Sequence, residues 1–318
     1  MFAACPAPWA AVLGSLLLGF EFVACLYVCA SHKRSGGRAP NRNDDRVIKE
    51  RFVRVGIASV LAPFIVWMIA ALSSEGRSPC VVAPLGRWFG LWAPAATAAT
   101  LLPLGLTMVL FLGPLTMGWL DRSWVDLADL LSLIRSQVKG PERLQLLRNL
   151  LIGPTAEEWV FRACMCPLLY GAGLADAANV FSSAVVFGLA HVHHRFDADT
   201  SWLAVAVQFT YTTLFGAYSS YLFLRTGLIY GPLLAHIFCN SMGLPDFGRV
   251  PGHAHSALLK AAFVVGLGSF VVCVTLDAIY RPRLFHSLFW AEALSLQMKQ
   301  AANQELAPVL APDEVVHA

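Results

Sequence analysis

The sequence predicts an all-α fold, a polytopic membrane bundle of about eight transmembrane helices. The chain has 318 residues, of which 57% are hydrophobic, and its mean hydropathy is +0.61. Only 14% of the residues are charged, whereas average soluble domains carry about 25%. Several apolar stretches reach the roughly 20 residues that a helix needs to cross the hydrocarbon core. The net charge of +3 is too small to indicate nucleic-acid binding.

The first region, residues 1–150, is predicted to hold N-terminal spans and polar connections. Trp9–Ala30 is a first apolar span, and no basic segment precedes it, so we expect a retained helix rather than a cleaved signal peptide. The following loop, Ser31–Arg54, holds eight Lys or Arg against three Asp or Glu, a balance of +5. The excess of basic residues places this loop in the cytosol, where it can also contact anionic lipid headgroups.

Two further features complete this region. Phe52–Leu72 is predicted to return across the membrane. The apolar run Trp88–Trp119 is longer than one straight span and contains three prolines, so we expect it to be tilted, kinked or partly re-entrant. Asp121–Asn149 mixes charges with spaced apolar residues, which predicts an interfacial amphipathic helix.

The remaining chain divides into a catalytic transmembrane core, residues 151–245, and a C-terminal region, residues 246–318. The C-terminal region contains a last span, Ala257–Tyr280, and a tail of mixed composition that ends in weakly structured sequence. The apolar segments around and within the core are Leu144–Tyr170, Asn179–His193, Trp202–Leu224 and Leu228–Met242.

The most informative stretch lies inside the apolar segment Leu144–Tyr170, where Glu157, Glu158 and Arg162 occur together. A charge at the centre of a bilayer costs about 2.5–3.5 kcal/mol on insertion scales, so such residues usually mark a functional site. Glu158 and Arg162 are four residues apart and therefore share one helix face. Glu157 points about 100° away from Glu158. One carboxylate is thus predicted to be neutralised and the other to remain available for chemistry; the alternative is a purely structural ion-pair cluster.

Two other polar pairs interrupt apolar segments. Phe187 and His191 are four apart, as are His236 and Asn240. A single histidine in an apolar helix is more often a hydrogen-bonding contact between helices than a catalytic group. Glu157, His191, His236 and Asn240 together supply what water-dependent hydrolysis of an amide needs. A carboxylate and a histidine can move the protons, and a second histidine and an amide can donate to the oxyanion.

These three motifs, Glu157-Glu158-xxx-Arg162, Phe187-xxx-His191 and His236-xxx-Asn240, resemble the signature motifs of the type II CAAX prenyl endopeptidases, the Ras-converting enzymes, in their eukaryotic branch. The resemblance covers about Gly153–Gly243. It implies a multi-pass enzyme of the endoplasmic reticulum membrane whose active site opens to the cytosol. The implied reaction removes the C-terminal aaX tripeptide from farnesylated or geranylgeranylated CAAX proteins such as small GTPases.

The resemblance also implies a role for each motif residue. Glu157 and His191 would activate the water, and His236 and Asn240 would stabilise the oxyanion. The residues implied to support the site structurally are Glu158, Arg162 and Phe187.

No cofactor is expected. Glu157, His191 and His236 could together bind zinc, but the sequence has no HExxH motif and no Cys/His ligand cluster. Metal-free catalysis is therefore our prediction, with a zinc-dependent version of the same protease as the alternative. The eight cysteines lie mostly in apolar segments and are expected to be small buried side chains.

Two alternatives from other classes remain open. Intramembrane Glu and His residues also build proton relays, so a proton-coupled transporter would explain the same residues. That class usually shows inverted repeats, and none is evident in the sequence. The second alternative is a catalytically silent scaffold of the same fold.

Overall fold

The protein is almost entirely helical in this computed structural model, which describes residues 2–4, 6–27, 42–73, 81–121, 140, 142–196, 201–280, 284–285 and 287–290. The exception within these ranges is a short antiparallel pairing of β1 (Phe2–Ala4) with β2 (Val81–Ala83). The predicted all-α membrane class is confirmed.

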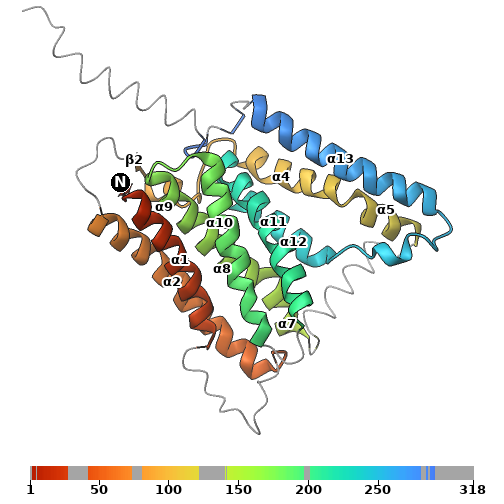
Figure 1. Cartoon of the computed structure of the whole chain (residues 1–318), viewed down its shortest axis with the longest axis horizontal. Coiled ribbons are helices and arrows are strands. Elements are labelled where there is room, and N and C mark those ends of the chain that lie inside the picture. The colour runs from red at the N-terminus through yellow and green to blue at the C-terminus, as the bar shows by residue number, and fades with distance from the viewer. Residues whose placement is uncertain are drawn as a thin grey trace, which may run out of the picture.

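One flank of the molecule consists of α1 (Pro8–Tyr27) and α2 (Asp45–Ser73), which pack side by side (Figure 1). The second helix begins at Asp45 rather than at Phe52, so the end of the predicted basic loop is helical. Glu50 explains the earlier start, because it forms ion pairs with Arg46 at 3.3 Å and Arg54 at 3.0 Å. Such i,i+4 pairs stabilise a helix. The rest of that loop, up to residue 41, lies outside the described residues.

The long apolar run is broken, as predicted. It forms α3 (Leu85–Trp88), α4 (Ala96–Leu110) and α5 (Leu112–Leu120), and the last two are bent by 68° relative to each other. Pro114 accounts for the bend, because it has no N–H to donate to the carbonyl four residues before it. Most of the predicted amphipathic segment, residues 122–139 and 141, lies outside the described residues.

The centre of the molecule is a continuous helix from Arg143 to Gly171 that is interrupted by two π-helical segments. Two π-helical segments, Arg148–Ile152 and Trp159–Cys164, separate the three α-helical parts. Each π segment precedes a proline, Pro154 or Pro167, which cannot supply the N–H of a regular α-helical turn. The α-helical parts are α7 (Arg143–Leu147), α8 (Gly153–Glu158) and α9 (Met165–Gly171).

Three more helices pack around this central helix. They are α10 (Asp176–His191), α11 (Trp202–Thr226) and α12 (Tyr230–Met242). A 3₁₀ turn, Val192–Phe196, follows α10. Gly188 and Gly216 allow α10 and α11 to approach closely, because a Cβ at either position would come within 2.0 Å of Thr213 Oγ1 or 3.1 Å of Phe187. Small residues at such contacts are typical of membrane helices.

The opposite flank is formed by α13 (Ser256–Tyr280), which packs against α4 and α5 (Figure 1). A short 3₁₀ turn, Phe247–Arg249, precedes it. In the described residues, α1, α2 and the part Ser256–Asp277 of α13 are long and apolar enough to cross a membrane, and the bent pair α4–α5 would be a fourth span. The total of about eight spans therefore remains a prediction.

The start of the C-terminal tail belongs to the protein core, which the sequence did not indicate. Phe285, Leu288, Phe289 and Trp290 are all buried. The Phe289 ring stacks on Phe223, at 5.3 Å between centroids, and meets Tyr170 edge to face at 5.4 Å. Residues 291–318 lie outside the described part of the chain.

Candidate active site

Glu157 and Glu158 end α8, directly before the π-helical segment Trp159–Cys164. π-helical insertions in α-helices are frequent at functional sites. The two adjacent carboxylates have different surroundings, as their spacing predicted. The Glu158 side chain is fully buried, whereas that of Glu157 is 21% exposed.

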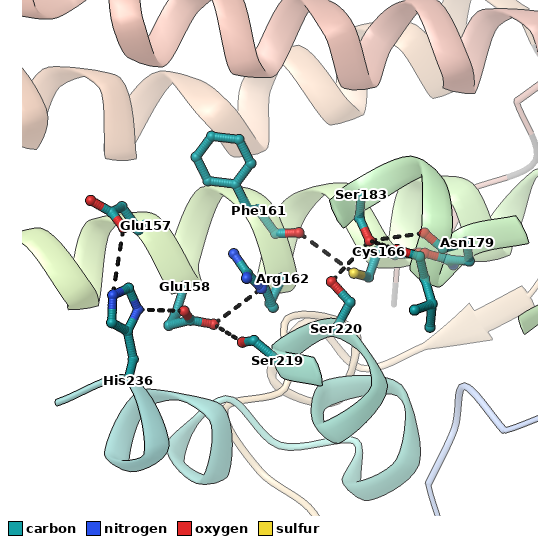
Figure 2. A network of polar contacts seen from close by, with 11 residues as sticks. Glu157, Glu158, Phe161, Arg162, Cys166, Asn179, Ser183, Ser219, Ser220 and His236 are labelled. Carbon is teal, nitrogen blue, oxygen red and sulfur yellow. Dashed lines mark hydrogen bonds and ion pairs between the residues drawn. The ribbon is translucent and has the colours of Figure 1, made fainter. Parts of the chain in front are cut away.

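Three side chains from three helices surround the Glu158 carboxylate (Figure 2). The Arg162 Nε lies 3.2 Å from Oε2, within ion-pair distance. Ser219 of α11 donates its hydroxyl to the same oxygen at 2.6 Å. The Nδ1 of His236 on α12 lies 2.7 Å from Oε1. Buried charges require this kind of pairing and hydrogen bonding, so the carboxylate joins the central helix to α11 and α12.

The Arg162 guanidinium is compensated in a second way, by aromatic rings. Its central carbon lies 4.3 Å from the centroid of the Phe187 ring and 6.0 Å from that of Phe215. Its Nη1 and Nη2 atoms form no hydrogen bond within the described part of the chain. The Nε–Glu158 contact is likewise an ion pair by distance rather than a hydrogen bond by geometry. Arg162 therefore depends on Glu158 and on cation–π contacts.

We predict that Glu158 and Arg162 are energetically coupled. Glu158→Gln should lower the free energy of unfolding by about 3–5 kcal/mol, because it leaves a buried guanidinium without its counter-charge. Arg162→Met should cost less, since His236 and Ser219 still contact the carboxylate. The double variant should be less destabilised than the sum of the two. Unfolding in mixed micelles measures the cycle.

The control is the separate ion pair of Arg225 and Asp277, whose Nε–Oδ2 distance is 2.6 Å. Asp277→Asn should combine additively with Arg162→Met. Simple additivity of the Glu158 and Arg162 variants would instead show that their contact contributes no coupling.

Glu157 faces a cavity of about 350 Å³ between α1, α2, the central helix and the ends of α10 and α12. His191 and Asn240, at the last turns of α10 and α12, also line it. The structure therefore brings these three predicted residues to one cavity. Its apolar wall consists of Phe22, Leu26, Phe52, Val55, Ile152, Pro154, Phe161 and Ala190.

His236 connects the cavity to the buried pair behind it. A carboxylate only accepts hydrogen bonds, so the Nδ1 of His236 carries the proton in its contact with Glu158. Its Nε2 then faces Glu157, at 3.7 Å from Oε2, too far for a direct hydrogen bond. The ring lies between two carboxylates with distinct surroundings (Figure 2).

Hydrogen bonds also orient His191 and Asn240. The Nδ1 of His191 lies 2.8 Å from the carbonyl oxygen of Phe187, so Nδ1 donates and the neutral ring has its lone pair on Nε2. The Phe187 and His191 rings are in contact, with centroids 4.7 Å apart. Asn240 donates from Nδ2 to the carbonyl of Asn149 at 2.9 Å. An amide nitrogen has a second N–H for another acceptor.

Sequence reasoning missed several residues of this site. Ser219 gave no pattern of its own, because serines in apolar helices commonly bond to their own backbone. Phe215, whose ring centroid lies 4.7 Å from that of His236, belongs to a stretch that resembles the eukaryotic branch, but the sequence assigned it no role in the site. The basic residues at the cavity, Arg42, Arg51 and Arg148, were assigned only to loop and interface.

The described residues contain no group of three or more His, Cys, Asp or Glu side chains arranged to hold a metal ion. The described cysteines are free thiols; Cys164 and Cys166 are buried, whereas Cys273 is exposed.

Comparison with known proteins agrees with the motifs. The family profile described as type II CAAX prenyl endopeptidase Rce1-like matches residues 140–242. "CAAX prenyl protease 2" of Homo sapiens is 38% identical over 310 residues, which cover 93% of this chain and 88% of that protein. "Probable CAAX prenyl protease 2" of Schizosaccharomyces pombe is 30% identical over 268 residues, covering 79% and 89%. The Arabidopsis thaliana "CAAX prenyl protease 2" is 41% identical over 146 residues, covering 43% and 45%.

No solved structure was found to match this chain. The extent of the matches to the human and fission-yeast proteins, together with the three motifs gathered in the fold, leads to one conclusion: this chain belongs to the Rce1-like family of type II CAAX prenyl endopeptidases, and is a membrane-embedded protease.

Proposed function

We propose that this protein removes the C-terminal aaX tripeptide from prenylated CAAX proteins by attack of an activated water molecule. The observation that carries the proposal is the convergence of Glu157, His191 and Asn240 on one cavity, with His236 Nε2 3.7 Å from Glu157 Oε2. A carboxylate, two histidines and an amide in one place are suited to amide hydrolysis.

Glu157 and His191 are the proposed water-activating pair. Glu157 has the more exposed of the two carboxylates and lines the cavity. His191 has its Nδ1 engaged by the Phe187 carbonyl, so its Nε2 can accept a proton. Glu157 or His191 takes the proton of the water molecule as its oxygen attacks the scissile carbonyl. The residue that has become protonated then donates a proton to the nitrogen of the leaving amine.

His236 and Asn240 are the proposed oxyanion donors. The amide nitrogen of Asn240 has two N–H groups. One donates to the carbonyl of Asn149, and the other can donate to the oxyanion. His236 can donate from Nε2 only when both of its nitrogens are protonated. Glu157 and Glu158 on its two sides are the groups that would stabilise this cation. Arg162, Ser219 and Phe187 are then structural supports, because they fix Glu158 and hence the ring.

The proposed substrates carry a farnesyl or geranylgeranyl group, as on small GTPases. The apolar wall of the cavity, formed by α1, α2, the central helix and α10, is compatible with a lipid chain and with aliphatic peptide side chains. We place the protein in the endoplasmic reticulum membrane, with the cavity open to the cytosol. The basic residues at the cavity support this orientation, since cytosolic segments carry excess Lys and Arg.

Incubating the protein in vesicles with a farnesylated CAAX peptide should release the tripeptide, measured by mass spectrometry. We predict that a strong chelator leaves the rate unchanged, because the proposed chemistry needs only protein groups. Glu157→Gln protein in the same vesicles gives the background. Loss of cleavage with the chelator and its recovery with zinc would show that the protease depends on a metal, with Glu157, His191 and His236 as its ligands. No release across several CAAX sequences would favour a transporter or a silent scaffold.

A further inference from the structure

Three arginines line the same cavity as the proposed catalytic residues. Arg42 precedes α2, Arg51 lies in its second turn, and Arg148 begins the first π-helical segment of the central helix. Glu157 is the single carboxylate among the lining residues of this cavity. The cavity therefore joins a cationic end to a catalytic carboxylate.

Hydrogen bonds hold this cationic end in place. Arg148 donates from Nη1 to the carbonyl of Arg42 at 2.7 Å and from Nη2 to Asn43 Oδ1 at 3.1 Å. Its Nε donates to Asn149 Oδ1 at 2.9 Å. These contacts tie the start of α2 to the central helix, although the residues are more than 100 positions apart. The positive charges of Arg42 and Arg51 both act on the Arg148 guanidinium.

Arg51 differs from the other arginines of α2. Arg46 and Arg54 both pair with Glu50. Within the described part of the chain, Arg51 forms no ion pair with a carboxylate, and it is partly buried at the cavity. Like charges close together, such as those of Arg51 and Arg148, repel one another. An anion entering this end of the cavity would offset that repulsion.

The spacing of the two ends fits a short peptide. Arg148 and Glu157 are nine positions apart on one continuous helix, which corresponds to about 13 Å between their backbone positions along its axis. Three extended residues span about 10 Å. The long side chain of Arg51, which lines the same cavity, can close the difference. A peptide whose scissile bond lies at Glu157 would thus place the end of its third following residue near the arginines.

We propose that Arg51, Arg148 and Arg42 form a subsite for the C-terminal carboxylate of the substrate peptide, which sets the cut three residues from the end. This inference rests on the proposed function. Arg51 supplies the charge, Arg148 supplies charge and anchors the start of α2, and guanidinium groups recognise carboxylates through paired hydrogen bonds. A phosphate headgroup could use the same chemistry, so the test must separate the two.

The test compares two farnesylated peptides of one sequence, one ending in a free carboxylate and the other in a carboxamide. Full-length protein in phosphatidylcholine vesicles should cleave the acid with a kcat/KM about 10- to 100-fold higher than the amide, the range of a charged hydrogen bond. Arg51→Gln should reduce cleavage of the acid to about the level of the amide, so that the preference for the acid disappears. An unfolding transition in mixed micelles like that of the unaltered protein shows that the variant is folded.

Arg46→Gln is the matched control, because this exposed arginine of the same helix does not line the cavity. It should keep the preference for the acid, and Arg51→Lys should keep part of it. Equal cleavage of both peptides by the unaltered protein, or an intact preference in Arg51→Gln, would overturn the proposal.

A headgroup site would give a different pattern. In vesicles with added phosphatidylserine, Arg51→Gln would then alter only the change in cleavage rate that the anionic lipid causes. The preference for the acid peptide would be intact, and this result would refute the carboxylate subsite. If the unaltered protein cleaves neither peptide, the proposed function itself fails.

Discussion

Glu157→Gln should reduce tripeptide release to near background while the protein remains folded. Glutamine keeps the size of the side chain but removes the oxygen that accepts a proton from water. General acid–base catalysis contributes about 10²–10⁴-fold to rates, and His191→Ala should fail in the same way. Single-turnover cleavage of a farnesylated peptide, followed by mass spectrometry, measures the loss.

Stability separates this effect from damage to the fold. Glu157 is partly exposed at the cavity, whereas Glu158 is fully buried, so Glu157→Gln should leave the free energy of unfolding nearly unchanged. Glu142→Gln, at an exposed carboxylate just before the same helix, should cleave at the unaltered rate. Near-normal cleavage by folded Glu157→Gln protein would refute the catalytic role of this carboxylate.

Asn240→Ala should lower kcat by about 10²–10³-fold, the loss found for one oxyanion donor elsewhere. KM should change little, because the donor acts mainly on the transition state. Steady-state kinetics with the farnesylated peptide give both constants. Asn240→Asp should be equally impaired, since it replaces the donor by an acceptor of similar size.

The neighbouring residue provides the matched control. Ser241 is exposed on α12 and bonds only to the carbonyl of Phe238 among the described residues, so Ser241→Ala should retain normal kinetics. A loss confined to KM in Asn240→Ala would assign the amide to substrate binding instead. Unchanged kinetics would remove Asn240 from the site.

Local relations within this site could be predicted from the sequence. Glu158 and Arg162 are four residues apart, so a single helix is enough to bring them into contact. The structure shows this ion pair. The differing exposure of Glu157 and Glu158 follows from the same helical geometry. The bend near Pro114 is also local, because one missing N–H weakens one turn.

Contacts between distant segments could not be predicted in this way. Ser219 meets Glu158 across 61 positions, and Arg148 meets the carbonyl of Arg42 across 106. Such contacts depend on which helices pack together, and apolar periodicity in a membrane helix does not specify its neighbours. The bond between His236 Nδ1 and Glu158 is such a contact, and it leaves the His236 ring a single nitrogen, Nε2, for the oxyanion.

The π-helical segments were missed although their signal was present. Pro154 and Pro167 stand in the central helix, and each follows one of the two segments. A proline in a helix usually indicates a break or a kink, whereas here the helix continues and the turn before each proline is π-helical. The wider turn Trp159–Cys164 follows Glu158 directly and contains Arg162 of the charged motif.

The burial of Phe289 has a consequence for biogenesis. Its ring packs against Trp88, Tyr170 and Phe223, which come from three earlier parts of the chain. During translation the ribosome delivers Phe289 after all three partners, and after α13 has emerged. The aromatic cluster of Trp88, Tyr170 and Phe223 is therefore incomplete until the chain beyond α13 has been synthesised, so this part of the core can form only after α13 has been made.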